Sequence, residues 1–259
     1  MYEFEFAKPA TLAEAVEAMK GEEAQALSGG QTLIPTLKAR LAMPGTLVSL
    51  AGIEELKGIS SEGGVMTIGG ATVHADVAKG GFPALAALAG GIGDPAVRTR
   101  GTIGGSLANN DPAACYPAAA LACGATIVTD RREIGADEYF QGLFETALEE
   151  GEIITAVRFP VPEAAAYAKF DQPASRFALV GVFVAKGPGG VRVAVTGASE
   201  DGVFRWSAAE EALSAEFSAD AIQDLAVDDS HMIEDLHGSR AYRAHLVGVM
   251  ARRAVAAAG

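Results

Sequence analysis

The chain has 259 residues, with a hydrophobic fraction of 49% and a charged fraction of 20%, which predicts a sizeable core in one large domain or in two or three small ones. Its formal net charge of −13 disfavours nucleic acids and anionic membranes as partners. The two cysteines, Cys115 and Cys123, are too few for an iron–sulfur cluster, which takes about four thiolates, and the four histidines lack the spacing of a zinc site.

The first fifty residues are predicted to form a small β-α-β-α-β unit. Strands are expected at 1–8, 24–27 and 46–50, and helices at 12–19 and 33–41. Thr11 and Glu14 have the spacing of a capping box, which marks the start of the first helix. The second strand runs into Gly29 and Gly30, and in open α/β sheets ligands gather at the carboxyl ends of strands.

The next hundred or so residues alternate between short strands and helices. After a connection at 54–64 that holds a short strand, further strands are expected at 65–68, 125–129 and 152–159. Helices are expected at 72–78, 83–88 and 113–123. Thr72 is the expected cap of the first of these helices, and Pro117 lies near the start of the third.

The pattern changes after Pro160-Val-Pro162. Strands are predicted at 167–170, 178–186 and 191–196, with a glycine-rich hairpin turn at 187–190 between the last two. A helix at 207–213 and a long amphipathic helix from about Arg240 complete the chain. We expect domain boundaries near 52–58 and 160–165.

Two glycine-rich segments carry the main chemical signal. Residues 101–112 contain Gly104 and Gly105, where the backbone can turn sharply and its N–H groups can form a nest for an anion such as phosphate, with Thr102 and Ser106 adding hydroxyl groups. Residues 28–33 have the same composition, between a predicted strand and a predicted helix. A plain surface turn is the alternative for either segment alone. Together they would clamp the two phosphates of a dinucleotide.

Neither segment matches a known nucleotide fingerprint. A P-loop would need Gly-Lys-Ser/Thr, and a Rossmann site would need Gly-x-Gly-x-x-Gly followed by an acidic residue, so an NAD site of that kind is disfavoured. Arg98 and Arg100 flank the second segment and would hold an anion or face solvent. Lys169 is either functional or a surface residue of an edge strand, and Cys115 is either a reactive thiol or part of the packing. The run 228–237 has metal-binding residue types but favours a solvated acidic loop.

The residues at 28–35, 92–108 and 111–112 resemble the FAD-binding medium subunits of molybdenum hydroxylases, which include the carbon monoxide dehydrogenase and xanthine dehydrogenase group. Segments 146–154, 169–177 and 242–246 extend the resemblance over essentially the whole chain. The resemblance implies an α+β protein with the vanillyl-alcohol-oxidase-like (PCMH-type) FAD-binding fold. It implies an N-terminal β-α-β subdomain at 1–54, a second FAD-binding subdomain at 55–162, and a C-terminal α/β domain at 163–259. This last domain would cover the flavin with a three-stranded antiparallel sheet and helices.

The resemblance also implies which residues bind FAD. The segment 28–33, the first glycine motif, would hold the pyrophosphate of FAD together with the segment 101–112, the second glycine motif. Further residues would lie near the isoalloxazine ring or the far end of the cofactor. Phe177 stands where carbon monoxide dehydrogenases have a tyrosine against the flavin, and Cys115 stands where many relatives have an aspartate. The implied cofactor-binding residues are Ser28, Gly29, Gly30, Gln31, Thr32, Leu33, Ile92, Gly93, Val97, Thr102, Ile103, Gly104, Gly105, Ser106, Asn110, Asp111, Ile154, Lys169 and Phe177.

By the same resemblance, the chain would be an electron-transfer subunit without catalytic or metal-binding residues of its own. A small subunit with [2Fe–2S] clusters would deliver electrons to its FAD, and a large molybdopterin subunit would oxidise the substrate, in a cytoplasmic dimer of heterotrimers. An independent FAD-dependent oxidoreductase and a flavin-free scaffold are the alternatives. No apolar run in the sequence has the length of a membrane span.

Overall fold

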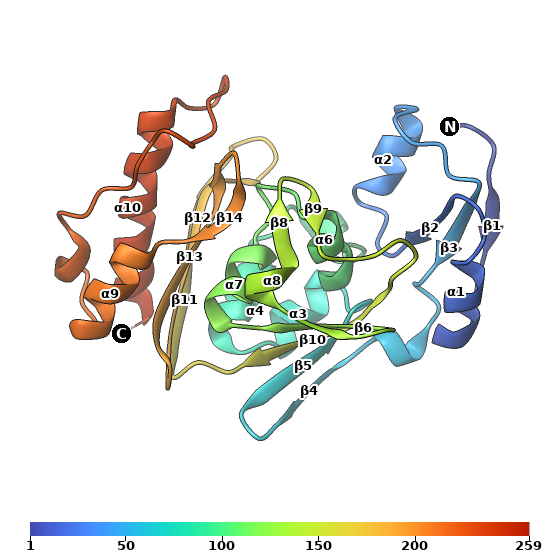
Figure 1. The fold of residues 1–259 in the computed structure, drawn as a ribbon, viewed down its shortest axis with the longest axis horizontal. Helices are drawn as coiled ribbons and strands as arrows, with labels where there is room; N and C mark the ends of the chain where they lie inside the picture. Colours follow the sequence, from blue (N-terminus) through green and yellow to red (C-terminus); the bar gives the residue numbers. More distant parts are fainter. Residues whose placement is uncertain (259) are drawn as a thin grey trace.

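The computed structural model describes residues 1–258, in which the first fifty residues form a three-stranded parallel sheet of order β1-β3-β2 (Figure 1). We call these residues the N-terminal unit. Its elements are β1 (Glu5–Ala7), α1 (Leu12–Ala18), β2 (Ala24–Leu27), α2 (Leu33–Lys38) and β3 (Thr46–Ser49). The predicted β-α-β-α-β order is confirmed. Thr11 caps α1 by accepting a hydrogen bond from the N–H of Glu14, whose own carboxylate accepts from Ala10 rather than from Thr11.

The middle of the chain builds a five-stranded antiparallel sheet of order β4-β5-β10-β6-β7. Its strands are β4 (Ile59–Glu62), β5 (Val65–Gly69), β6 (Thr126–Thr129), β7 (Glu133–Gly135) and β10 (Ile154–Pro160). The helices between β5 and β6 are α3 (His74–Gly80), α4 (Pro83–Gly90), α5 (Pro95–Arg98), α6 (Ile103–Asn109) and α7 (Tyr116–Cys123). Short elements complete the region: η1 (Glu54–Leu56), α8 (Ala136–Tyr139), β8 (Phe140–Gly142) and β9 (Glu145–Thr146). The central strand β10 comes last in sequence, so the sheet closes around this helical insertion.

The C-terminal part contains a four-stranded antiparallel sheet of order β11-β12-β13-β14. Its elements are β11 (Ala164–Asp171), β12 (Ala178–Gly187), β13 (Gly190–Ser199), β14 (Gly202–Arg205), α9 (Ser207–Ala215), η2 (Asp220–Ile222) and α10 (Arg240–Ala258). The three predicted strands are present, and β14 adds a fourth that the sequence analysis did not predict.

The alternation of side chains along β12 explains how this sheet joins two cores. Val182 and Val184 lie in one buried cluster with residues of α10 such as Leu246, whereas Phe183 and Ala185 lie in the cluster that contains α7. Successive side chains of a strand point to opposite faces, so a continuous apolar strand is buried on both sides. In Figure 1, α9 and α10 flank the sheet on its outer side, away from the middle of the molecule.

Two boundaries differ from the expected ones for tertiary reasons. Helix α3 begins at His74, because the Thr72 hydroxyl bonds to the N–H and carbonyl of Gly58 (3.0 and 3.1 Å) instead of capping the helix. Residues 103–109, expected as a glycine loop, form helix α6. The domain boundaries at 54/55 and 162/163 stay predictions.

The acidic run 228–237 has a structural role in its last part. Asp235 forms an ion pair of 2.8 Å with Arg243 of α10, and Arg243 also donates to the carbonyls of Leu179 and Gly197. Within residues 1–258, no group of three or more His, Cys, Asp or Glu side chains is arranged to hold a metal ion. None of the helices in the described chain combines the length and apolar character that crossing a membrane requires.

Candidate functional site

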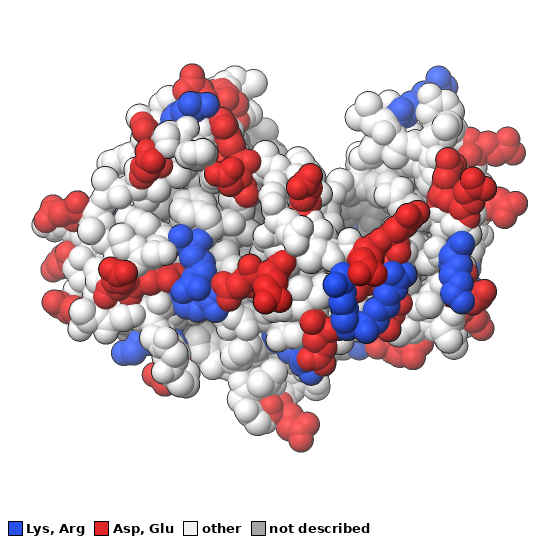
Figure 2. Space-filling view, viewed as in Figure 1, with Lys and Arg blue, Asp and Glu red and all other residues white. Residues whose placement is uncertain are grey.

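A cavity of about 560 Å³ lies where the N-terminal unit meets the middle of the molecule. Its walls come from β2 and α2, from α5 and α6, from residues 111–115 and 148–154, and from the loop at 175–177. Figure 2 shows the molecule hollowed between the N-terminal unit, on the right, and the central part. Segments far apart in the sequence therefore share one binding space.

The two glycine motifs touch each other at one side of this cavity. A Cβ atom on Gly29 would lie 2.2 Å from the carbonyl oxygen of Arg100 and 2.6 Å from the Cα atom of Gly101. The hydroxyl groups of Ser28 and Thr102 are 2.8 Å apart. Glycine at position 29 is therefore required by a backbone-to-backbone contact, because any side chain would push the two motifs apart.

The second motif uses its N–H groups inside the protein. Thr102 caps α6 by accepting from the N–H of Gly105 (3.1 Å), while Ile103 and Gly104 donate to the carbonyls of Thr72 and Gly70 (3.1 and 2.9 Å). The amide nest predicted at Gly104 and Gly105 is therefore wrong. A Cβ atom on Gly104 would lie 2.6 Å from the carbonyl oxygen of Gly70, so this glycine allows close packing of the helix.

The first motif leaves its N–H groups free for a ligand. Within residues 1–258, the backbone N–H groups of residues 29–33 donate no hydrogen bond, although all five residues line the cavity. Gly30 adopts a φ of +70°, which turns the chain from β2 into α2. Successive free N–H groups attract an anion, so this turn fits the pyrophosphate of a dinucleotide.

Arg98 holds a further wall of the cavity in place. Its guanidinium donates to the carbonyls of Ile92 and Gly93 (3.0 and 2.9 Å), and Asp94 caps the short helix α5 by accepting from the N–H of Val97 (2.9 Å). Ile92, Gly93 and Val97 all line the cavity. Arg98 thus holds the loop that contains Ile92 and Gly93 in place through hydrogen bonds to two of its carbonyl groups.

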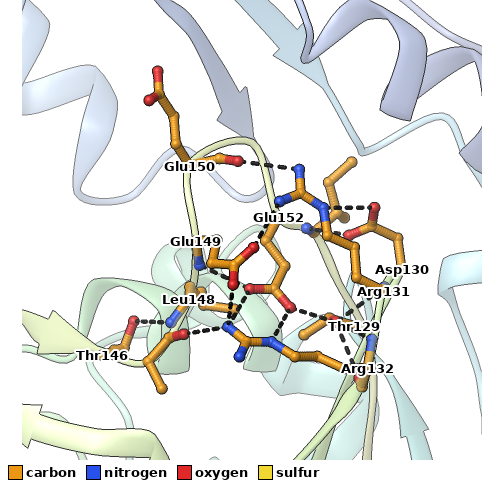
Figure 3. A network of polar contacts seen from close by, with 11 residues as sticks. Thr129, Asp130, Arg131, Arg132, Thr146, Leu148, Glu149, Glu150 and Glu152 are labelled. Atoms are coloured by element: carbon orange, nitrogen blue, oxygen red, sulfur yellow. Dashed lines mark hydrogen bonds and ion pairs between the residues drawn. The ribbon is translucent and has the colours of Figure 1, made fainter.

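The buried carboxylate of Glu152 anchors the segment 148–154. Figure 3 shows this carboxylate facing Arg132 and Thr129, which donate to it at 3.1 Å (through both Nε and Nη2 of Arg132) and 2.7 Å, and the N–H of Glu149 adds a bond of 2.7 Å. Burial alone would raise the pKa of Glu152, but these donors together lower it to about 2. The segment that this network fixes supplies Leu148, Glu152, Ile153 and Ile154 to the cavity.

Lys169 joins two walls of the cavity without lining it. Its ammonium group donates to the carbonyls of Gly91 and Arg176 (2.8 Å each) and pairs with Asp171 at 2.8 Å, and its side chain is only 8% exposed. Gly91 precedes the cavity residue Ile92, and Arg176 and Phe177 line the cavity from the facing loop. Lys169 is therefore neither a surface residue nor a residue with a free ammonium group.

The structure brings nearly all of the expected cofactor-binding residues together around the cavity. The exceptions are Ile103, Asn110 and Lys169. Ile103 is buried in the core, and the side-chain amide of Asn110 donates to the carbonyls of Gly142 and Glu145 at 2.8 Å each. The role of each expected residue in binding FAD stays a prediction.

Several cavity residues are absent from the set of expected cofactor-binding residues. They include His74, Asn109, Cys115, Glu152, Ser175 and Arg176. Burial raises the pKa of the Cys115 thiol, as expected for a packed cysteine. Of these residues, Glu152 is the one that the local sequence sets apart, because it is an acidic residue at the start of the otherwise apolar strand expected at 152–159.

Comparisons with known proteins agree with this geometry. The family described as "FAD binding domain in molybdopterin dehydrogenase" matches residues 2–162. The chain is 34% identical to the carbon monoxide dehydrogenase medium chain of Hydrogenophaga pseudoflava, over 98% of this chain and 96% of that protein. It is 32% identical to the nicotine 6-hydroxylase medium subunit of Paenarthrobacter nicotinovorans, with the same coverage.

Solved structures give the same fold. Carbon monoxide dehydrogenase from Hydrogenophaga pseudoflava, in a form that lacks the Mo-pyranopterin moiety of the molybdenum cofactor, matches with a TM-score of 0.86 at 33% identity, over 99% of this chain and 97% of that one. Quinoline 2-oxidoreductase from Pseudomonas putida 86 matches with a TM-score of 0.89 at 26% identity and the same coverage. The similarity extends over the N-terminal unit, the middle sheet and the C-terminal sheet together.

Proposed function

Because this chain belongs to the family of FAD-binding medium subunits of molybdenum hydroxylases, an oxidoreductase family, we propose that it serves as the electron-transfer subunit of such a complex. In this proposal it accepts electrons from the [2Fe–2S] clusters of a small subunit and passes them to an external acceptor. A large molybdopterin subunit oxidises the substrate, in a cytoplasmic dimer of heterotrimers. A carbon monoxide dehydrogenase type of complex is favoured, since two curated medium chains of that enzyme are each 34% identical to this chain.

The observation that carries the proposal is the cradle formed by the first glycine motif. The free N–H groups of residues 29–33 would bind the pyrophosphate of FAD, and Gly29 keeps this turn against the second motif. Ile92, Ile154 and Phe177 would line the space for the isoalloxazine ring. Bound FAD would supply reversible acceptance and release of electrons, while the residues of this chain would bind it, orient it and exclude water.

The first experiment is a titration of the purified full-length chain with FAD, followed by its visible absorbance and flavin fluorescence. We expect one FAD per chain and no oxidation of substrate by the chain alone. A folded chain that does not bind FAD would contradict the proposal and favour the flavin-free scaffold.

The second experiment tests the partners. Co-expression with candidate small and large subunits should give a stable complex. In this complex, electrons from the substrate that the large subunit oxidises should reduce the flavin only when the iron–sulfur subunit is present. A chain that binds FAD and oxidises a substrate without those subunits would instead support the independent oxidoreductase.

A further inference from the structure

His74 is a buried polar residue on the cavity wall. It opens helix α3, and its backbone N–H donates to the carbonyl of Gly101 at 2.9 Å. The residue is 5% exposed, and it lines the cavity together with Gly101 and Thr102. The imidazole thus lies beside the junction of the two glycine motifs.

The orientation of the imidazole ring is fixed by its neighbours. A Cβ atom on Gly101 would lie 2.6 Å from Nε2 of His74, so only glycine leaves room for the ring here. The ring of Tyr116 lies on another side, with the ring centroids 5.3 Å apart and an interplanar angle of 50°. Nε2 is therefore the ring nitrogen next to the cavity-lining backbone of Gly101.

The surroundings of Nδ1, the other ring nitrogen of His74, indicate which of the two nitrogens carries the imidazole proton. Nδ1 is buried and has no hydrogen-bond partner among the described residues. Burial, with the charge of Arg98 as a second cause, lowers the pKa of His74 to about 4, so the ring is neutral near pH 7. A neutral imidazole carries one N–H group, and a buried N–H without a partner is rarer than a buried acceptor without one. The proton is therefore assigned to Nε2.

We propose that His74 is a cofactor-binding residue whose Nε2–H would donate a hydrogen bond to an oxygen on the chain that joins the two ring systems of FAD. This inference rests on the proposed function, because it takes FAD as the occupant of the cavity. The N–H groups of residues 29–33 would hold the pyrophosphate of FAD, and His74 lines the same cavity beside Gly101 and Thr102. An oxygen atom of the bound cofactor close to the pyrophosphate would then be within reach of the imidazole. A neutral donor binds such an oxygen without adding charge to the site.

The test compares FAD affinities of the full-length wild type, His74→Leu and His74→Gln. Loss of one neutral hydrogen bond weakens binding about threefold to tenfold, which we expect for His74→Leu. The amide group of glutamine reaches near the position of Nε2, so His74→Gln should recover most of the affinity. His245→Leu, at an exposed position of α10, is the matched control and should bind FAD as the wild type does.

A second measurement uses the wild type and does not depend on how the variants fold. In the chain labelled with ¹⁵N-histidine, which has four histidines, the Nε2–H signal of His74 should be present without FAD and should shift when FAD is added. His74→Leu with wild-type affinity, or a proton found on Nδ1, would overturn the assignment while leaving the proposed function intact. A wild type that binds no FAD would overturn both.

Discussion

Replacing Gly29 by alanine should separate the two glycine motifs. The new Cβ atom would lie 2.2 Å from the Arg100 carbonyl oxygen and 2.6 Å from the Gly101 Cα atom, both of them backbone atoms that no side-chain rotation can move away. The two segments must then part by roughly 1 Å, and overpacking of this kind typically costs about 1–3 kcal/mol. The shift also displaces the free N–H groups of residues 29–33. Loss of a single hydrogen bond to a charged phosphate, about 1.5–3 kcal/mol, weakens FAD binding at least about tenfold.

Two assays measure these effects separately. Titration with FAD gives the affinity, and unfolding in urea gives the change in the free energy of unfolding. Gly135→Ala is the matched control, because its Cβ atom would meet nothing within 4 Å and its φ of −65° suits alanine. If Gly29→Ala binds FAD and unfolds as Gly135→Ala does, the contact between the motifs is not the reason for glycine at position 29.

Two further predictions concern the walls of the cavity. Lys169→Met removes the ammonium group that joins Gly91 to Arg176. Amide hydrogen exchange in residues 172–177 should therefore become faster, and the affinity for FAD should fall. Lys79→Met, at an exposed site, is the control and should change neither the exchange nor the affinity. Glu152 has a lowered pKa of about 2, so its contribution to stability is complete above its ordinary pKa of 4.5 and is lost as the pH falls through about 2. Urea unfolding at several pH values gives the free energy of unfolding as a function of pH. Below pH 4.5 this free energy should fall less steeply for Glu152→Gln than for the wild type. Equal pH dependence in the two proteins would contradict the conclusion that Arg132 stabilises the charged form of Glu152.

The sequence allowed the first glycine motif to be interpreted correctly as a turn between a strand and a helix. Its elements are local, because β2 and α2 flank Gly29 and Gly30 directly and each has its own hydrophobic pattern. The second motif was interpreted as a loop, because two adjacent glycines are unfavourable within a helix. Helix α6 forms despite this, since Gly104 lies against the backbone of Gly70, which is distant in the sequence.

Arg98, Glu152 and Lys169 show a second limit of sequence reasoning. Each was an ambiguous or unnoticed charged residue in the sequence, and each proves to hold a cavity wall through hydrogen bonds to other segments. Among these partners, Arg132 lies 20 residues before Glu152, and Gly91 lies 78 residues before Lys169. No local pattern identifies such a pair, because a charged side chain has the same sequence appearance on a solvated surface and in a buried bridge.

The sequence by itself determined the family, most of the secondary structure and the positions of the two glycine motifs, because these depend on short-range backbone preference and on hydrophobic periodicity. The tertiary structure alone decided that the N–H groups of the first motif stay free while those of the second are used inside the protein. It also decided that His74 lies beside Gly101 with one nitrogen unpaired. Hydrogen-bond partners and close backbone contacts depend on which segments meet in space, and only the packed fold brings those segments together.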